Sequence, residues 1–166
     1  MNSLQVRQKV EVAIINVYQK DKFLFEEGLC ERCINHRFAV YLERENFGPG
    51  YYVDCEYNKS HLPTPTGVTT SPKMLSSMRG NFIDIILTTR DGRHEGDFIC
   101  FEIKRATNRD LTAERKDRKN LEILTDKERF GYKFGFYVIF GKERAVYDVY
   151  KNGKVELQGI EVNPLY

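Results

Sequence analysis

Three charged residues lie within stretches of sequence that are otherwise apolar. Asp84 interrupts the apolar run 82–87, and Glu102 and Lys104 interrupt the run 98–104. Such runs are typical of buried β-strands, and a lone buried carboxylate is costly unless it is paired with a cation or binds a metal ion. We therefore expect these three side chains to take part in ion pairing or in metal chemistry.

A divalent cation is one way to hold the two carboxylates together. Alternation along a strand places Glu102 and Lys104 on the same face of a sheet, and Asp84 lies beside Glu102 if the two runs pair as a hairpin. Adjacent carboxylates repel, and a hard cation such as Mg²⁺ or Mn²⁺, which needs only one or two carboxylates in addition to water, removes the repulsion. Lys104 would then orient or deprotonate an attacking water, or neutralise a phosphate. The alternative is a buried carboxylate–lysine pair with a purely structural use.

Hydrophobic periodicity and breaker residues divide the chain into helices and strands that would position these residues. The order is α-α-β-β-β-α-β-β-β, which predicts a single α/β domain over 1–166 with helices packed on a mixed sheet. The Asn152-Gly153 turn predicts a C-terminal β-hairpin. The expected helices span 2–20, 29–45 and 112–128, and the expected strands span 51–57, 82–89, 97–105, 132–140, 144–150 and 154–160.

A long polar connection separates the first two expected strands. Residues 58–81 hold three of the five prolines and many Ser and Thr residues. A loop of this length is usually functional or disordered. We expect a mobile segment that acts as a lid or strand-separating flap, or a disordered insert.

The arrangement of Asp84 on one strand and Glu102-Ile103-Lys104 on the next resembles the PD-(D/E)xK nuclease superfamily, whose restriction-endonuclease-like fold has the core order α-β-β-β-α-β. The resemblance covers about residues 29–140. Segments 31–37, 54–59 and 84–86 also look like a group of uncharacterised bacterial proteins assigned to that fold. The chain departs from the pattern in one respect, because Ile83 stands where the superfamily often has Pro.

The resemblance implies a metal-dependent phosphodiesterase that cleaves nucleic acid, with DNA as the expected substrate and RNA as the alternative. It implies that Asp84, Glu102 and the backbone carbonyl of Ile103 bind Mg²⁺ or Mn²⁺, and that Lys104 serves the water or the phosphate. Many members add a glutamate from the first core helix, for which Glu31 is the first candidate. Glu43 is a second candidate for that glutamate. Members often act as dimers because two strands must be cut, although the sequence shows no clear dimer patch.

A basic run lies in the helix that follows the motif. Arg115, Lys116, Arg118 and Lys119 would contact the phosphate backbone of a nucleic acid. The alternative is a solvated helix face with ion pairs between residues four apart. Because 26 basic residues are offset by 24 acidic ones, any nucleic-acid site must be a local patch.

The length of the apolar runs and the N-terminal sequence both bear on where in the cell the protein is expected. No run approaches the roughly 20 apolar residues that span a bilayer. The first residues lack the pattern of a secretory signal. We expect a soluble cytoplasmic protein without a membrane partner.

Other residues that could take part in chemistry have simpler explanations. Cys30 and Cys33 form a C-x-x-C without a second pair at zinc-site spacing, and Cys55 and Cys100 lie in apolar runs, so buried free thiols are favoured over zinc or redox chemistry. His36 and His61 could act as general bases, but neither has a Ser or Cys nucleophile partner in a sequence motif. Asp54 and Glu56 share a strand face and could extend the acidic cluster, although such residues are more often edge-strand charges. Residues 132–137 are read as core aromatics rather than as a base-stacking surface.

Two other function classes remain open. One is a non-catalytic module of the same fold that binds nucleic acid or a protein, with an acidic cluster that no longer binds metal. The other is a structural or inhibitor protein whose buried ion pair serves stability. In the structural case Asp84→Asn should destabilise the protein by about 3–5 kcal/mol, because it leaves a buried partner unpaired.

Overall fold

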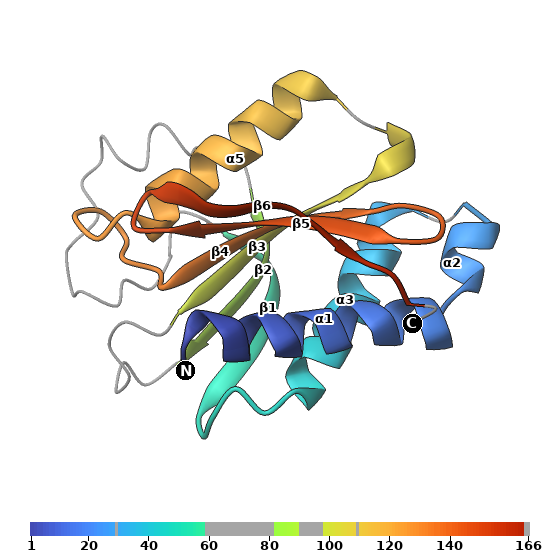
Figure 1. The fold of residues 1–166 in the computed structure, drawn as a ribbon, viewed down its shortest axis with the longest axis horizontal. Helices are drawn as coiled ribbons and strands as arrows, with labels where there is room; N and C mark the ends of the chain where they lie inside the picture. Colours follow the sequence, from blue (N-terminus) through green and yellow to red (C-terminus); the bar gives the residue numbers. More distant parts are fainter. Residues whose placement is uncertain (29, 59–81, 90–97, 109, 165–166) are drawn as a thin grey trace.

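The computed structural model describes residues 1–28, 30–58, 82–89, 98–108 and 110–164. They form a six-stranded mixed sheet with helices on both faces (Figure 1). These six strands lie side by side in chain order; the third and fourth are parallel neighbours, and the other neighbouring pairs are antiparallel. The expected α/β class with a mixed, helix-flanked sheet is confirmed. The strands are β1 (Tyr51–Asn58), β2 (Phe82–Thr89), β3 (Ile99–Arg105), β4 (Phe134–Phe140), β5 (Ala145–Lys151) and β6 (Lys154–Val162).

The helices begin and end close to the expected positions. Asn2 caps the first helix, because its side chain accepts a hydrogen bond from the Gln5 backbone N–H at 2.9 Å. The third expected helix stops at Thr125 instead of residue 128, because Asp126 takes an extended backbone conformation. The helical segments are α1 (Ser3–Lys20), α2 (Phe23–Glu26), α3 (Glu31–Arg44), the 3₁₀ turn η2 (Ala106–Asn108) and α5 (Leu111–Thr125).

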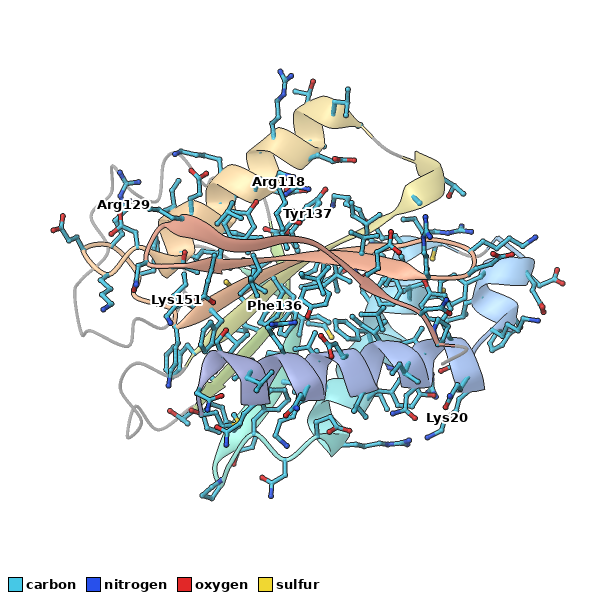
Figure 2. The ribbon with its side chains drawn as sticks, viewed as in Figure 1. Lys20, Arg118, Arg129, Phe136, Tyr137 and Lys151 are labelled. Carbon is cyan, nitrogen blue, oxygen red and sulfur yellow. The ribbon has the colours of Figure 1, made fainter. Side chains whose placement is uncertain are left out.

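The sheet separates two hydrophobic cores. Helices α1 and α3 cover one face and α5 covers the other (Figure 1). Side chains of β4 alternate between the two cores, and Figure 2 shows Phe136 on the α1 side and Tyr137 on the α5 side. Both residues are fully buried, as are Tyr132 and Phe134, so the expected core role of residues 132–137 is confirmed.

The link between β3 and β4 runs through α5. Because parallel strands require a crossover connection, α5 crosses the sheet and packs on β3, β4 and β5. The crossover brings the first turns of α5 to the end of β3 that carries Lys104. The parallel β3–β4 pair thus decides which part of α5 meets the candidate site.

Some expectations concern parts of the chain that the structure does not describe. The expected lid or flap over residues 58–81 lies outside the described residues from residue 59 onward, as does His61. Within the described residues, no helix combines the length and the apolar character needed to cross a bilayer.

Candidate active site at the end of strand β3

One cleft, of about 440 Å³, collects the four side chains that the sequence singled out for catalysis. Asp84 comes from β2, Glu102 and Lys104 come from β3, and Glu31 is the first residue of α3. Asp117 from α5 joins them. The other residues that line the cleft are Arg32, Asn35, Glu56, Ala113 and Lys116.

The Asp84 side chain replaces part of the β2–β3 ladder. The register pairs Ile85 with Phe101, and its continuation would place Ile83 opposite Ile103. Instead, the Ile103 backbone N–H donates to Asp84 Oδ2 at 2.7 Å. In an antiparallel pair the N–H and C=O groups of one residue point toward the same neighbouring strand, so the Ile103 carbonyl also faces this side of β3.

The ladder is also irregular on the other side of Asp84. The β1–β2 register skips the step that would pair Glu56 with Asp84, and Glu56 has a φ of 48°, in the left-handed region. The Glu56 carboxylate instead pairs with the Arg32 guanidinium at 3.1 Å. Strand distortions of this kind are frequent next to active sites, where they redirect side chains.

Asp84 lies in surroundings that disfavour its charged form. Burial raises the pKa of Asp84 to about 6, which outweighs the Ile103 hydrogen bond and the charge of Lys104, and the charges of Glu31 and Asp117 act in the same direction as burial. A carboxylate in this state gains stability from an added cation.

Lys104 is surrounded by carboxylates. Its Nζ atom lies 3.0 Å from Asp117 Oδ2 and 3.7 Å from Glu31 Oε1. Burial would lower the pKa of Lys104, but the charges of Asp117, Asp84 and Glu31 raise it well above its usual value. The surrounding carboxylates therefore favour the charged form of Lys104.

Glu31 ties the start of α3 to the end of β3. Its Oε2 atom accepts a hydrogen bond from the Arg105 backbone N–H at 3.1 Å, and its other oxygen faces Lys104. Glu43 lies near the far end of α3, where it is exposed and lines a separate hollow with Tyr51. The structure thus places Glu31, and not Glu43, with the other candidate residues.

Asp117 was not among the residues chosen from the sequence, because it lies within a basic run. A usable signal was present. Asp117, Leu121 and Leu124 follow the i, i+4, i+7 spacing of one helix face, and all three are buried. That spacing places Asp117 on the face of α5 that packs against the sheet.

The four basic residues of α5 point to different surroundings. Arg118 donates to Asp148 and, at 3.1 Å, to the Tyr150 hydroxyl, and its guanidinium lies 4.2 Å from the ring centre of Tyr137 (Figure 2). Lys119 pairs with Glu122 at 2.6 Å. The other two residues, Arg115 and Lys116, are exposed, and Lys116 lines the cleft.

The cysteines are free thiols in the structure, but only one is buried. Cys100 is buried as expected. The expectation of buried thiols is wrong for Cys30 and Cys55, which are exposed, and Cys33 is half-buried. Cys30 directly precedes α3 and Cys55 lies on the edge strand β1, and these positions leave both side chains accessible to solvent.

The cleft offers oxygen atoms that suit a hard cation. Asp84 and Glu102 line the cleft, and the family resemblance implies the Ile103 carbonyl as a third ligand. The buried Asn35 Oδ1 atom, also in the cleft, has no hydrogen-bond partner. An orphaned acceptor of this kind fits a cation or one of its water ligands. Within the described part of the chain, no group of three His, Cys, Asp or Glu side chains has metal-holding geometry, so such a site would use two carboxylates with backbone and water oxygens.

Comparisons with family models, with curated proteins and with solved structures found no match to this chain.

Proposed function

We propose that the protein is a metal-dependent nuclease of restriction-endonuclease-like fold, which hydrolyses phosphodiester bonds of nucleic acid, with DNA as the proposed substrate. The observation that carries this proposal is the convergence of Asp84, Glu102, Lys104 and Glu31 in one cleft, although they come from three separate elements. Perturbed charges that gather in a cleft are a recognised mark of active sites.

The cation of the proposed enzyme is Mg²⁺ or Mn²⁺. Asp84, Glu102 and the Ile103 carbonyl would hold it, and the raised pKa of Asp84 supports this choice because a cation relieves the cost of its charge. When bound, the cation would stabilise negative charge on the phosphate and make a bound water more acidic.

Residues of the chain itself supply a positive charge in the cleft and hold it in position. Lys104 carries a proton and faces the cleft, where it can neutralise a phosphate oxygen. Asp117 and Glu31 fix the Lys104 side chain from two sides, at 3.0 and 3.7 Å. Lys116 lies at the rim of the cleft and would contact the backbone of the nucleic acid. Cleavage of both strands of a duplex would require two copies of the chain, so a homodimer belongs to the proposal.

Glu102→Gln is the direct test. Glu102 is only 2 % exposed and Gln keeps its shape, so the variant should fold. We expect cleavage of duplex and single-stranded DNA by the wild type with Mg²⁺ or Mn²⁺, and a loss of about 100-fold or more in the variant. Glu128→Gln, at an exposed carboxylate beyond the end of α5, is the matched control and should retain full activity. Equal activity of Glu102→Gln and wild type would remove the proposed site.

A non-catalytic binding module is the second candidate, and one observation favours it. Lys104 already pairs with Asp117 and Glu31, so part of the negative charge of the cluster is balanced without an added cation. This alternative predicts DNA or protein binding that is insensitive to Mg²⁺, with no cleavage. Calorimetric titration with Mg²⁺ and Mn²⁺ separates the two candidate functions. The nuclease requires that the wild type binds the cation and that Asp84→Asn abolishes this binding, whereas the binding module requires neither.

A further inference from the structure

We propose that Cys30 and Cys33 form a redox-active dithiol, which small-molecule disulfides oxidise reversibly to an intramolecular disulfide. The proposal concerns thiol chemistry alone and does not depend on the nuclease activity proposed above. It also reverses the expectation, drawn from the C-x-x-C spacing, that these cysteines are buried and inert.

The two sulfur atoms already lie in contact. Cys30 Sγ and Cys33 Sγ are 3.3 Å apart, and the Cys33 backbone N–H donates to the Cys30 carbonyl at 3.0 Å, which holds this turn in place. A disulfide has a sulfur–sulfur distance of about 2.05 Å. Rotation of the two side chains covers a difference of this size, so the bond can form without unwinding α3.

The two cysteines differ in the way that a nucleophile and its resolving partner differ. Cys30 is exposed and directly precedes the first turn of α3, and hydrogen bonds from Cys33 and then from the Arg32 backbone lower the pKa of its thiol. The pKa of Cys33 is raised by the same sulfur–sulfur hydrogen bond. Attack therefore begins at Cys30, because the thiolate is the reactive form of cysteine.

The other two cysteines provide an internal comparison. Cys100 is buried in β3 and cannot meet a reagent. Cys55 is exposed, but partial burial and then the charges of Asp54 and Glu56 raise the pKa of its thiol. Exposure alone therefore does not make a thiol reactive in this protein, and only the Cys30–Cys33 pair combines access, a favoured thiolate and a neighbouring thiol among the described residues.

The reaction is a pair of thiol–disulfide exchanges. The Cys30 thiolate attacks one sulfur of a disulfide RSSR, which forms a Cys30–SR bond and releases RS⁻. Cys33 loses its proton to solvent and attacks Cys30 Sγ, which forms the Cys30–Cys33 bond and releases the second RS⁻. The protein loses two electrons and two protons, and RSSR is reduced to two thiols. An excess of reduced thiol drives the same steps backward.

Incubation of the folded protein in glutathione redox buffers of stepped composition tests the proposal. We expect a mass loss of two hydrogens, mapped to the peptide that holds residues 30 and 33, and full recovery of the thiols under reducing buffer. Cys33→Ser should stop at a mixed disulfide on Cys30. Cys55→Ser is the matched control and should oxidise like the wild type.

A rate measurement tests the reactivity separately. Iodoacetamide at pH 7 should alkylate Cys30 about tenfold or more faster than Cys55, since reactivity follows the thiolate fraction. The proposal is overturned if the folded protein forms no 30–33 disulfide in any buffer, or if Cys55 reacts as fast as Cys30. Neither readout uses nuclease activity, so failure here leaves the nuclease proposal unaffected, and failure of the nuclease assay leaves this one unaffected.

Discussion

Lys104 Nζ lies 3.0 Å from Asp117 Oδ2, and this contact joins the central strand β3 to the crossover helix α5. Both side chains are largely shielded from water, with exposed fractions of 18 % and 12 %. Shielding strengthens a charge pair, and it fixes a long lysine side chain that would otherwise be free to rotate. In the proposed nuclease, Asp117 is therefore a positioning residue for Lys104.

Removal of the Asp117 charge should weaken catalysis more than DNA binding. For Asp117→Asn we expect kcat to fall by about 10–100-fold, the size of effect seen when a supporting partner of an active-site group is lost. The affinity for DNA should change little. Steady-state cleavage and equilibrium binding measure the two quantities.

Glu122→Gln is the control for this experiment, because Glu122 is a carboxylate of the same helix that pairs with exposed Lys119. It should leave kcat unchanged. If Asp117→Asn cleaves as fast as the control, the pair with Lys104 serves stability alone.

Asp84→Asn should stabilise the protein without metal at neutral pH. A raised pKa means that the folded state binds a proton more tightly than the unfolded state. The charged carboxylate therefore costs stability above pH 6, and the cost disappears below about pH 4. Asn removes the cost and can still accept the Ile103 hydrogen bond, so we expect a gain of up to about 3 kcal/mol at pH 7.5.

Urea unfolding at pH 7.5, 6 and 4.5 measures this gain, which should shrink as the pH falls. Glu128→Gln should show no such trend. A loss of stability in Asp84→Asn at pH 7.5 would instead support the structural ion-pair class. Added Mg²⁺ should stabilise the wild type and not the variant, because ligand binding to the folded state adds to its stability.

Lys116 and Arg118 should give opposite results although both belong to the basic run. Lys116→Ala should weaken DNA binding and reduce the salt slope of the affinity by about one, as expected for the loss of one phosphate contact. The stability of the Lys116→Ala variant should equal that of the wild type. Fluorescence anisotropy at stepped salt concentrations provides the slope.

Arg118→Ala should instead destabilise the fold by about 3 kcal/mol, because Asp148 is only 3 % exposed and would lose its guanidinium partner. Thermal unfolding measures this loss. A folded Arg118→Ala protein with a lower salt slope and unchanged stability would contradict the assignment of Arg118 to a structural pair with Asp148.

Gly135 allows α5 to approach the sheet closely. A Cβ atom at this position would lie 3.1 Å from Thr125 Cγ2 and 3.2 Å from Leu121 Cδ2. Gly135→Ala should therefore lower stability by about 1–3 kcal/mol, as overpacking does, which differential scanning calorimetry can measure. Gly28→Ala is unsuitable as a control because its φ of 67° adds strain. Ala113→Gly, in α5, would show whether any substitution in this helix lowers stability.

The sequence by itself determined the class of fold and most element boundaries. Alternation and 3.6-residue periodicity reflect which side chains are buried, and the helices and strands that the structure describes follow these patterns. It also determined that Asp84, Glu102 and Lys104 need partners, because a charge inside an apolar strand is too costly to leave alone. Glu31 was predicted only from the resemblance to a nuclease superfamily.

The tertiary structure decided which charges meet. The crossover from β3 to β4 brings Asp117 to Lys104, and the opening of the ladder at Asp84 directs its carboxylate to the Ile103 N–H. The same packing separates Arg118 from Lys116, although they are two residues apart. These outcomes depend on the relative placement of elements far apart in the chain. Local sequence does not encode that placement, because the cost of burying a charge depends on neighbours that only folding supplies.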